Sequence, residues 1–299
     1  MNITRQQEEK YLPVPEDKQR IKVLLSKLHR SVTAARENEN AYYDEMKDRK
    51  AVECYYRGID MNHDSMEELQ QSLSQLLQET HTRQVRYNPA EYVYPWVDLR
   101  PDGTLTNVYS GEKRNAEEVI KEDADIAARR RTAMENESDD EQAPAIAAEL
   151  KFNCEHAVPQ SWFGEKEPMR GDIHHLFTCE PVCNSIRSNY PYYDFEDYTP
   201  GSIDPNRVEK ACGKAEKELF EPEHGKGPAA RAMLYFLLRY PEEIDASYSE
   251  AIDVELLQKW HKEFPPDLYE KHRNQAIFEI QGNRNPFIDF PDKHLMTKV

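Results

Sequence analysis

One segment of the chain, residues 152–190, constrains its fold and chemistry more than any other. It concentrates histidines, carboxylates, amides and arginines in the manner of a catalytic site. The candidate residues are Glu155, His156, Arg170, Asp172, His174, His175, Asn184 and Arg187. The apolar pattern predicts a strand over 152–158, ended by a proline, and a second strand over 173–177. A short helix should then open with Pro181 at its first position.

The predicted order of strand, loop, strand and helix decides which side chains can meet. Glu155 and His156 are neighbours on a strand and therefore point to opposite faces. Twist, a bulge or a long reach must bring them to one site. Asn184 and Arg187 are three positions apart on the predicted helix and share a face.

Side chains of these types suit the hydrolysis of a phosphodiester. A carboxylate and an amide oxygen are hard ligands of the kind that Mg²⁺, Mn²⁺ or Ca²⁺ prefers. A neutral histidine can take a proton from an attacking water, and an arginine can bind a phosphate oxygen. The reaction needs all three functions, namely a general base, a cation for the developing charge and a phosphate clamp.

The cysteines allow several interpretations. The chain has five of them, and four fall in one region: Cys154, Cys179, Cys183 and Cys212. With the nearby histidines they could bind a structural zinc ion, because the spacing from Cys179 to Cys183 is tolerable for zinc ligands. Disulfide pairing and free thiols are the alternatives. A Cys–His hydrolase centred on Cys154 lacks an identifiable orienting partner.

The rest of the chain is predicted to be mainly helical. In two N-terminal segments apolar residues recur at helical spacing and form a stripe, and the second segment follows a capping box of Ser65 and Glu68. The stripes are Ile21, Leu24, Leu25, Leu28 and Val32, then Met66, Leu69, Leu73, Leu76 and Leu77. Further expected elements are a hairpin over 93–109 around a turn at 100–103, and helices over 117–134, 229–240, 253–264 and 267–281.

The stretch 135–141 contains five acidic residues in seven positions. Mutual repulsion predicts an exposed loop there, and an interaction tail or a calcium-binding segment is the alternative. It lacks the spaced oxygen ligands and central glycine of an EF-hand loop. We expect one compact domain, in which residues 1–90 form a helical elaboration and residues 91–299 the catalytic region.

Composition limits the partners and the compartment. The chain has 39 Lys+Arg against 56 Asp+Glu and a formal charge of -17. This charge excludes a protein that coats nucleic acid with a surface that is basic throughout, but it does not exclude a local basic surface. Its apolar runs fall far short of the ~20 residues of a membrane span, so no membrane partner is expected. The first ten residues contain no apolar signal-peptide core, which predicts a cytoplasmic protein, and we expect a monomer.

Several ordered strings match one known family. The strongest reads Asn153-Cys-Glu155-His156-Ala-Val-Pro159-Gln-Ser-Trp162-Phe163. Others lie at 172–177, 184–190 and 279–289, with shorter ones at 97–99, 109–111, 230–232 and 239–241. Together they resemble the bacterial endonuclease I family of His-Me finger, or ββα-metal, nucleases. The resemblance runs from about residue 90 to residue 292.

The resemblance implies an α+β fold that is mainly helical, with a central ββα-metal motif and a small antiparallel sheet. It implies an endonuclease without sequence specificity that cuts DNA, and in many members RNA, to 5′-phosphate ends. One divalent cation is implied, Mg²⁺ or else Mn²⁺ or Ca²⁺. By position, His156 resembles the general base, Glu155 and Asn184 the metal ligands, and Arg187 a phosphate-contacting arginine.

Other residues are expected in supporting roles. His174 or His175, with Asp172, would orient the base or a metal-bound water. Some family members have an acidic residue where this chain has Arg170, so a third protein ligand is not expected there. The candidates to line a nucleic-acid surface are Arg170, Arg187 and Arg284. For Arg284 the alternative is a capping and packing turn after the last helix.

Two rival hypotheses accompany the nuclease hypothesis. One is a catalytically inactive module that binds nucleic acid or a protein on the same scaffold. The other is a zinc-dependent hydrolase built on the cysteines and histidines. Many family members are secreted or periplasmic, which conflicts with the cytoplasmic expectation.

Overall fold

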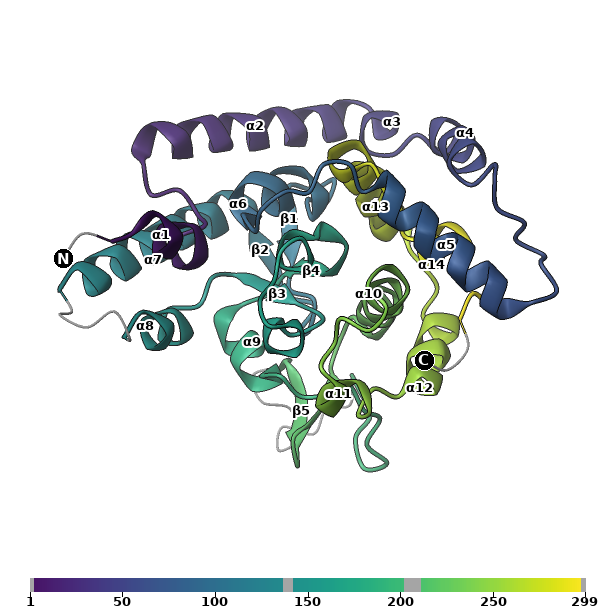
Figure 1. The fold of residues 1–299 in the computed structure, drawn as a ribbon. Coiled ribbons are helices and arrows are strands. Elements are labelled where there is room, and N and C mark those ends of the chain that lie inside the picture. Colours follow the sequence, from purple (N-terminus) through teal and green to yellow (C-terminus); the bar gives the residue numbers. More distant parts are fainter. Residues whose placement is uncertain (1–2, 137–141, 202–210, 297–299) are drawn as a thin grey trace.

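The computed structural model describes residues 3–136, 142–201 and 211–296, and it is mainly helical (Figure 1). Within these residues the strands form two-stranded antiparallel sheets, in which β1 pairs with β2, β3 with β4 and β5 with β6. The predicted α+β class is therefore confirmed. No helix of the described residues is both long and apolar enough to span a membrane.

The N-terminal part is built from helices. They are α1 (Arg5–Tyr11), α2 (Lys18–Glu37), α3 (Glu39–Tyr42), α4 (Glu45–Tyr55), α5 (Met66–Thr80) and α6 (Pro89–Tyr92). Helix α2 begins after Asp17, whose carboxylate accepts a hydrogen bond from Arg20 N at 2.8 Å. It buries Leu24 and Leu28, as the apolar stripe predicts.

The cap of α5 is formed in part as predicted. Ser65 Oγ accepts a hydrogen bond from Glu68 N at 3.3 Å. The Glu68 carboxylate instead lies 3.0 Å from His63 Nε2, outside the helix, which replaces the reciprocal bond of a capping box. The helix buries Leu69, Leu73 and Leu77, the inner edge of the predicted stripe.

The predicted hairpin over 93–109 is wrong in its first strand. Residues Val93–Val97 form the π-helix η1, and four of the five are buried. A short, continuous apolar run cannot be assigned to strand or helix by its period alone, which explains the error. The turn at 100–103 exists, because Gly103 N donates to Arg100 O at 2.9 Å. It leads into β1 (Thr104–Thr106), which pairs with β2 (Lys113–Asn115).

The charged helix expected over 117–134 is confirmed as α7 (Ala116–Asn136). It therefore includes the first two residues of the acidic stretch 135–141, and the remaining five lie outside the described residues. The short helix α8 (Ala143–Glu149) follows and packs against both α7 and α1.

The central strands are shorter than predicted. They are β3 (Cys154–His156) and β4 (Leu176–Thr178), joined through the 3₁₀ turns η3 (Gln160–Phe163), η4 (Met169–Gly171) and η5 (Ile173–His175). Asp172 causes the shift of β4, because its carboxylate accepts from His174 N at 3.1 Å and so holds η5 in a turn. The predicted helix after the second strand is confirmed as α9 (Pro181–Arg187).

The C-terminal part contains the hairpin β5 (Gly213–Glu216) and β6 (Leu219–Pro222) and a set of helices. The helices are α10 (Lys226–Arg239), α11 (Ala246–Ser249), α12 (Val254–Glu263), α13 (Leu268–Gln281) and α14 (Pro286–Asp289). The three predicted C-terminal helices agree with α10, α12 and α13 to within a few residues. Gly282 ends α13 with a φ of 96°, the left-handed conformation expected of a C-terminal glycine.

Helix α10 lies at the centre of the molecule (Figure 1). Almost its whole length is buried, and it packs against α12, α5, α14 and η5. With α5, α12 and Phe177 of β4 it forms one apolar cluster. A second apolar cluster joins η1, α2 and α7 to Cys154 of β3 and Leu176 of β4. The pair β3–β4 therefore lies between two cores, which accounts for the burial of all its residues.

The buried carboxylate of Asp172 links η5 to two of these helices. Its Oδ2 accepts hydrogen bonds from Tyr235 Oη at 2.8 Å and Tyr240 Oη at 2.9 Å, both on or next to α10. Its Oδ1 accepts from Gln281 Nε2 of α13 at 3.0 Å. Burial alone would raise the pKa of Asp172, but nearby imidazoles, first His81, and the Gln281 bond hold it well below the usual range.

We expect Asp172→Asn to lower the free energy of unfolding by about 2–4 kcal/mol at neutral pH, since it leaves buried donors without their charged acceptor. Because the folded-state pKa is depressed, the contribution is present above the unfolded value of 3.8 and is lost as the pH falls through the folded value. Denaturant titrations at several pH values measure this. An equal difference between variant and wild type at pH 7 and below pH 3 would contradict it.

Candidate active site

The pair β3–β4 and helix α9 carry the main candidate residues. In the antiparallel register Glu155 is opposite Phe177 and His156 is opposite Leu176. Helix α9 packs against β3 and carries Asn184. The strand–strand–helix order predicted from the sequence is present, with the loop between the strands folded into 3₁₀ turns.

Glu155 is 4% exposed, and its carboxylate is held by two neighbours. Tyr109 Oη donates to Oε1 at 2.9 Å, and Arg187 Nε lies 3.3 Å from the same oxygen. Within the described residues Oε2 forms no hydrogen bond with another side chain. Burial raises the pKa of Glu155 to about 7, against the opposing effects of Arg187 and Tyr109.

The amide of Asn184 is oriented by the backbone of β3. Its Nδ2 donates to Cys154 O at 3.0 Å. Because a carbonyl oxygen only accepts, the amide nitrogen must face the strand and Oδ1 must face away from it. No described residue donates to Oδ1, so this oxygen is free to bind a ligand.

These oxygens fit a hard divalent cation. Glu155 Oε2 and Asn184 Oδ1 are a carboxylate and an amide oxygen without side-chain partners, the ligand types that Mg²⁺, Mn²⁺ and Ca²⁺ take. Among the described residues, no group of three or more His, Cys, Asp or Glu side chains is placed to hold one ion. A cation here would therefore keep several water ligands, as Mg²⁺ usually does.

The imidazole of His156 has a defined tautomer. Its Nε2 lies 2.9 Å from Arg170 O, and because a carbonyl cannot donate, Nε2 must carry the proton. Nδ1 then has the lone pair, and no described residue forms a hydrogen bond with it. Burial, reinforced by His175, holds the pKa of His156 well below its usual range. The ring is therefore neutral and able to accept a proton at Nδ1.

Glu155 and His156 point to opposite sides of β3, as the alternation of a strand predicts. Glu155 contacts Tyr109 and Arg187, whereas the His156 ring lies 4.8 Å from that of Tyr87 and 5.3 Å from that of His175. No hydrogen bond or ring contact joins the two side chains in the described part of the chain. Both are about 5% exposed or less.

The two histidines after Asp172 have different surroundings. His175 packs edge-on against His156 and donates to Met169 O at 2.6 Å, so it is the one that contacts the candidate base. His174 turns towards α10, with its ring 4.3 Å from that of Tyr235, and is remote from this contact.

Arg187 is placed to hold Glu155. It is 0% exposed, and its guanidinium donates to Ala157 O at 2.9 Å and Ser188 O at 3.1 Å while pairing with Glu155. A group enclosed in this way has no free face for a phosphate. The structure therefore contradicts the predicted phosphate contact in this conformation and gives Arg187 a positioning role.

Arg284 does not line a substrate surface. It is fully buried, and it binds Asp289 at 2.8 and 2.7 Å and Asp48 at 2.9 Å. This placement agrees with the alternative that Arg284 belongs to a packing turn after the last helix. It does not agree with the predicted contact between Arg284 and nucleic acid. Arg170 is 8% exposed; its carbonyl holds His156, while its guanidinium binds Gln160 Oε1 at 2.8 Å and Lys10 O at 2.5 Å.

Sequence reasoning missed two aromatic residues of the site. Tyr109 donates to Glu155, and Tyr87 packs on His156. Tyr109 lies in one of the short matching strings at 109–111, which was the available signal. Tyr87 has no comparable signal, because its role depends on the path of the chain between α5 and α6.

The cysteines divide into one disulfide and three free thiols among the described residues. Cys183 of α9 is bonded to Cys212, which directly precedes β5. Cys154 and Cys179 are buried and free, and Cys54 is exposed and free. The pairing removes Cys183 and Cys212 from the candidate zinc ligands. The disulfide anchors the helix that carries Asn184.

We expect the double substitution Cys183→Ser and Cys212→Ser to lower the free energy of unfolding by about 3–4 kcal/mol, since the disulfide closes a loop of 29 residues. Denaturant titration without reductant measures the loss. Thiol titration of the unfolded wild type should find three free thiols before reduction and five after. Five thiols before reduction would contradict the pairing.

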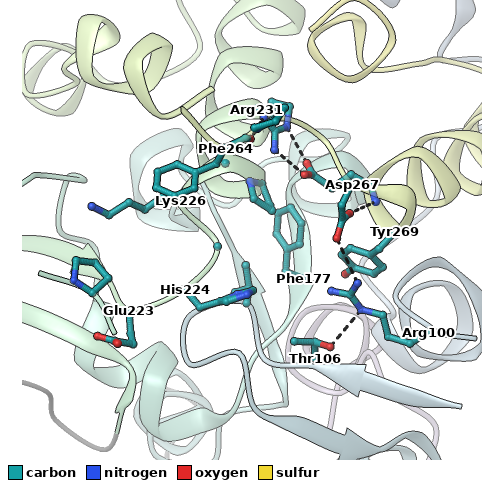
Figure 2. A pocket seen from close by; sticks show the side chains of 17 residues that line it. Arg100, Thr106, Phe177, Glu223, His224, Lys226, Arg231, Phe264, Asp267 and Tyr269 are labelled. Carbon is teal, nitrogen blue, oxygen red and sulfur yellow. Dashed lines mark hydrogen bonds and ion pairs between the residues drawn. The ribbon is translucent and has the colours of Figure 1, made fainter. Parts of the chain in front are cut away.

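A separate pocket of about 250 Å³ lies beside the β3–β4 pair (Figure 2). Its wall includes Phe177, the cross-strand partner of Glu155, but none of the metal or base candidates. Its cations already have partners. Arg231 pairs with Glu270 at 2.5 Å, and Arg100 lies 3.5 Å from Asp267. This pocket therefore adds nothing to the candidate chemistry.

Comparisons with known proteins identify the family and relatives of this chain. A family model described as Endonuclease I matches residues 65–292. A periplasmic deoxyribonuclease of Aeromonas hydrophila is 31% identical over 161 residues, which is 46% of this chain and 63% of that protein. An extracellular ribonuclease of Bacillus amyloliquefaciens is 36% identical over 160 residues, 47% of this chain and 52% of that protein.

An extracellular deoxyribonuclease of Aeromonas hydrophila is 32% identical over 159 residues, covering 46% of this chain and 66% of that protein. The matched region thus spans between 52% and 66% of the length of these curated relatives. Since they are named as periplasmic or extracellular, the cytoplasmic expectation finds no support. The division of the chain at residue 90 stays a prediction.

Proposed function

Because this chain belongs to the endonuclease I family, we propose that it is an endonuclease that hydrolyses phosphodiester bonds of nucleic acid with the help of one divalent cation. The observation that carries the proposal is the fixed tautomer of His156. Its Nε2 donates to Arg170 O at 2.9 Å, which leaves the lone pair of Nδ1 for a proton.

His156 acts as the general base in this proposal. Nδ1 takes a proton from the water that attacks the phosphorus, and Arg170 O stabilises the imidazolium that results through the bond to Nε2. The contact with His175 fixes the ring plane. The base is therefore oriented before the substrate arrives, which lowers the cost of reaching the reactive geometry.

Glu155 and Asn184 would hold the cation. Arg187 and Tyr109 fix one carboxylate oxygen of Glu155, and Cys154 O fixes the amide of Asn184. When bound, a Mg²⁺, Mn²⁺ or Ca²⁺ ion supplies charge stabilisation at the phosphate oxygens. A structural zinc ion is the less favoured proposal, since two of the four candidate cysteines are bonded to each other.

We infer that the substrate is DNA, and RNA as well, and that the enzyme acts as a monomer without sequence specificity and leaves 5′-phosphate ends. Relatives named as a deoxyribonuclease and as a ribonuclease each match a little under half of this chain. A backbone-directed nuclease needs contacts to phosphates alone, which carry no sequence information.

We infer further that the protein acts outside the cytoplasm, in the periplasm or as a secreted enzyme. The disulfide between Cys183 and Cys212 supports this, because structural disulfides persist in oxidising compartments. The names of the periplasmic and extracellular relatives point in the same direction.

We expect His156→Ala to lower the rate of plasmid cleavage in Mg²⁺ by about 10²–10⁴-fold, the usual contribution of a general base. Substitution of the exposed His29 by alanine is the matched control and should leave the rate unchanged. Circular dichroism checks that both variants fold. Cleavage by His156→Ala at the wild-type rate would refute the assigned base, and absence of cleavage by the wild type in Mg²⁺, Mn²⁺ and Ca²⁺ would favour the binding module.

We expect Asn184→Ala to raise the Mg²⁺ concentration needed for half-maximal cleavage by about tenfold or more, because one ligand oxygen is lost. Asn189→Ala, just beyond the end of α9, is the control. Titration of cleavage rate against Mg²⁺ separates the variants, since excess metal should restore much of the rate to Asn184→Ala. An unchanged metal requirement would remove Asn184 from the ligand set.

A further inference from the structure

Helix α1 contacts several arginines, one of which, Arg170, orients the candidate general base. Arg131 Nη1 is 2.8 Å from Glu8 Oε1, and Arg86 Nη1 is 2.6 Å from Glu9 Oε2. Arg170 Nη2 donates to Lys10 O at 2.5 Å. Three successive residues of α1 thus bind arginines from α7, from the segment before α6 and from η4. Figure 1 shows α1 beside the C-terminal half of α7.

This contact reaches the active site through one residue. Arg170 holds His156 with its carbonyl and α1 with its guanidinium. Tyr87 fills the space between them, with its ring 4.8 Å from that of His156 and 5.2 Å from the Arg170 guanidinium carbon. The group of Arg86, Arg131 and Arg170, here termed the arginine strip, therefore begins at the residue that orients the base.

We propose that the arginine strip binds the phosphate backbone of the nucleic-acid substrate, and that α1 occupies it in the free protein with the carboxylates of Glu8 and Glu9 and the backbone carbonyl of Lys10. The inference rests on the proposed function and gives its substrate a binding surface. It also identifies α1 as a segment that the substrate displaces.

The chemistry of the contacts supports a phosphate ligand. Glu8 and Glu9 present carboxylate oxygens to the same guanidinium groups that would bind phosphate oxygens, since the arginine fork matches both anions. Glu16, just after α1, adds a second carboxylate to Arg131. Arg86 and Arg131 are thus held by carboxylates of the chain itself, and Arg170 by the backbone carbonyl of Lys10.

The attachment of α1 is weak enough to be displaced. The helix has seven residues and buries none of them. Its ion pairs lie at the surface, with Arg86 and Glu9 side chains 67% and 38% exposed. Pairs of this kind contribute little and are screened by salt, and a helix this short is unstable by itself. A polyanion can therefore compete for the arginines.

The extent of the family match supports the same role for α1. The family match covers residues 65–292, which includes all three arginines but not α1. The covering helix is thus an addition to a family-type catalytic region. With a net charge of -17, the protein also needs a local basic surface to hold nucleic acid, and Arg187 and Arg284 do not supply one because they are fully buried.

The test compares nucleic-acid binding by charge variants of the full chain. The triple variant Glu8→Gln, Glu9→Gln and Glu16→Gln frees the strip. The matched control is Glu37→Gln, Glu53→Gln and Glu67→Gln, exposed residues that form no ion pair with a described residue and change the net charge equally. Binding of a fluorescently labelled DNA duplex is followed by anisotropy in EDTA, where no cleavage interferes.

We expect the α1 variant to bind about tenfold more tightly than the control, with a salt slope steeper by about one to two, because freed arginines release counterions on binding. Adding Arg86→Gln and Arg131→Gln should return its affinity to that of the control. Arg170 is kept intact because its carbonyl holds His156. Thermal unfolding confirms that each variant is folded.

Equal binding by the α1 variant and the control would overturn the inference, as would tighter binding that survives loss of Arg86 and Arg131. Plasmid cleavage by the wild type in Mg²⁺ is measured in parallel. If the wild type cleaves the plasmid but the α1 variant and the control bind DNA equally, the proposal of the arginine strip is overturned and the nuclease proposal stays in place. Tighter binding without any cleavage supports the strip as a phosphate site and overturns the nuclease proposal.

Discussion

The carboxylate of Asp172 is the interaction on which the rest of the site depends. It joins the turn before β4 to α10 through Tyr235 and Tyr240, and to the end of α13 through Gln281. Because the same carboxylate accepts from His174 N, it also sets where the turn ends and β4 begins. The start of β4 in turn fixes its register with β3, and hence the position of the candidate base and metal ligand.

Backbone carbonyls then orient the two decisive side chains. Arg170 O requires a proton on His156 Nε2, and Cys154 O requires the amide nitrogen of Asn184 to face the strand. In both cases an acceptor that cannot donate leaves a free lone pair on the opposite atom. The arrangement depends on main-chain geometry, which the two cores on either side of β3–β4 hold in place.

Most arginines of the central region serve the interior and not the surface. Arg187 pairs with Glu155, Arg231 with Glu270 and Arg284 with Asp289, all of them buried. Each such pair is costly to break, since removing one partner leaves an uncompensated buried charge. These three arginines are therefore not free to bind a substrate, and the more exposed Arg86 and Arg131 are held by α1.

The sequence by itself determined the features that depend on neighbouring positions: part of the cap of α5, the helices α7, α10, α12 and α13, and the order of β3, β4 and α9. It also determined the chemical inventory of segment 152–190, because the base, the carboxylate and the amide all lie within that one stretch of the chain. It misplaced η1 as a strand, since a short apolar run has no distinguishing period. Only the tertiary structure decided that Tyr109 holds Glu155, that Cys183 pairs with Cys212 and that Arg284 is enclosed by Asp48 and Asp289. Most of these partners are far apart in the chain, and all of them meet only where the two cores bring their elements together, which no local pattern encodes.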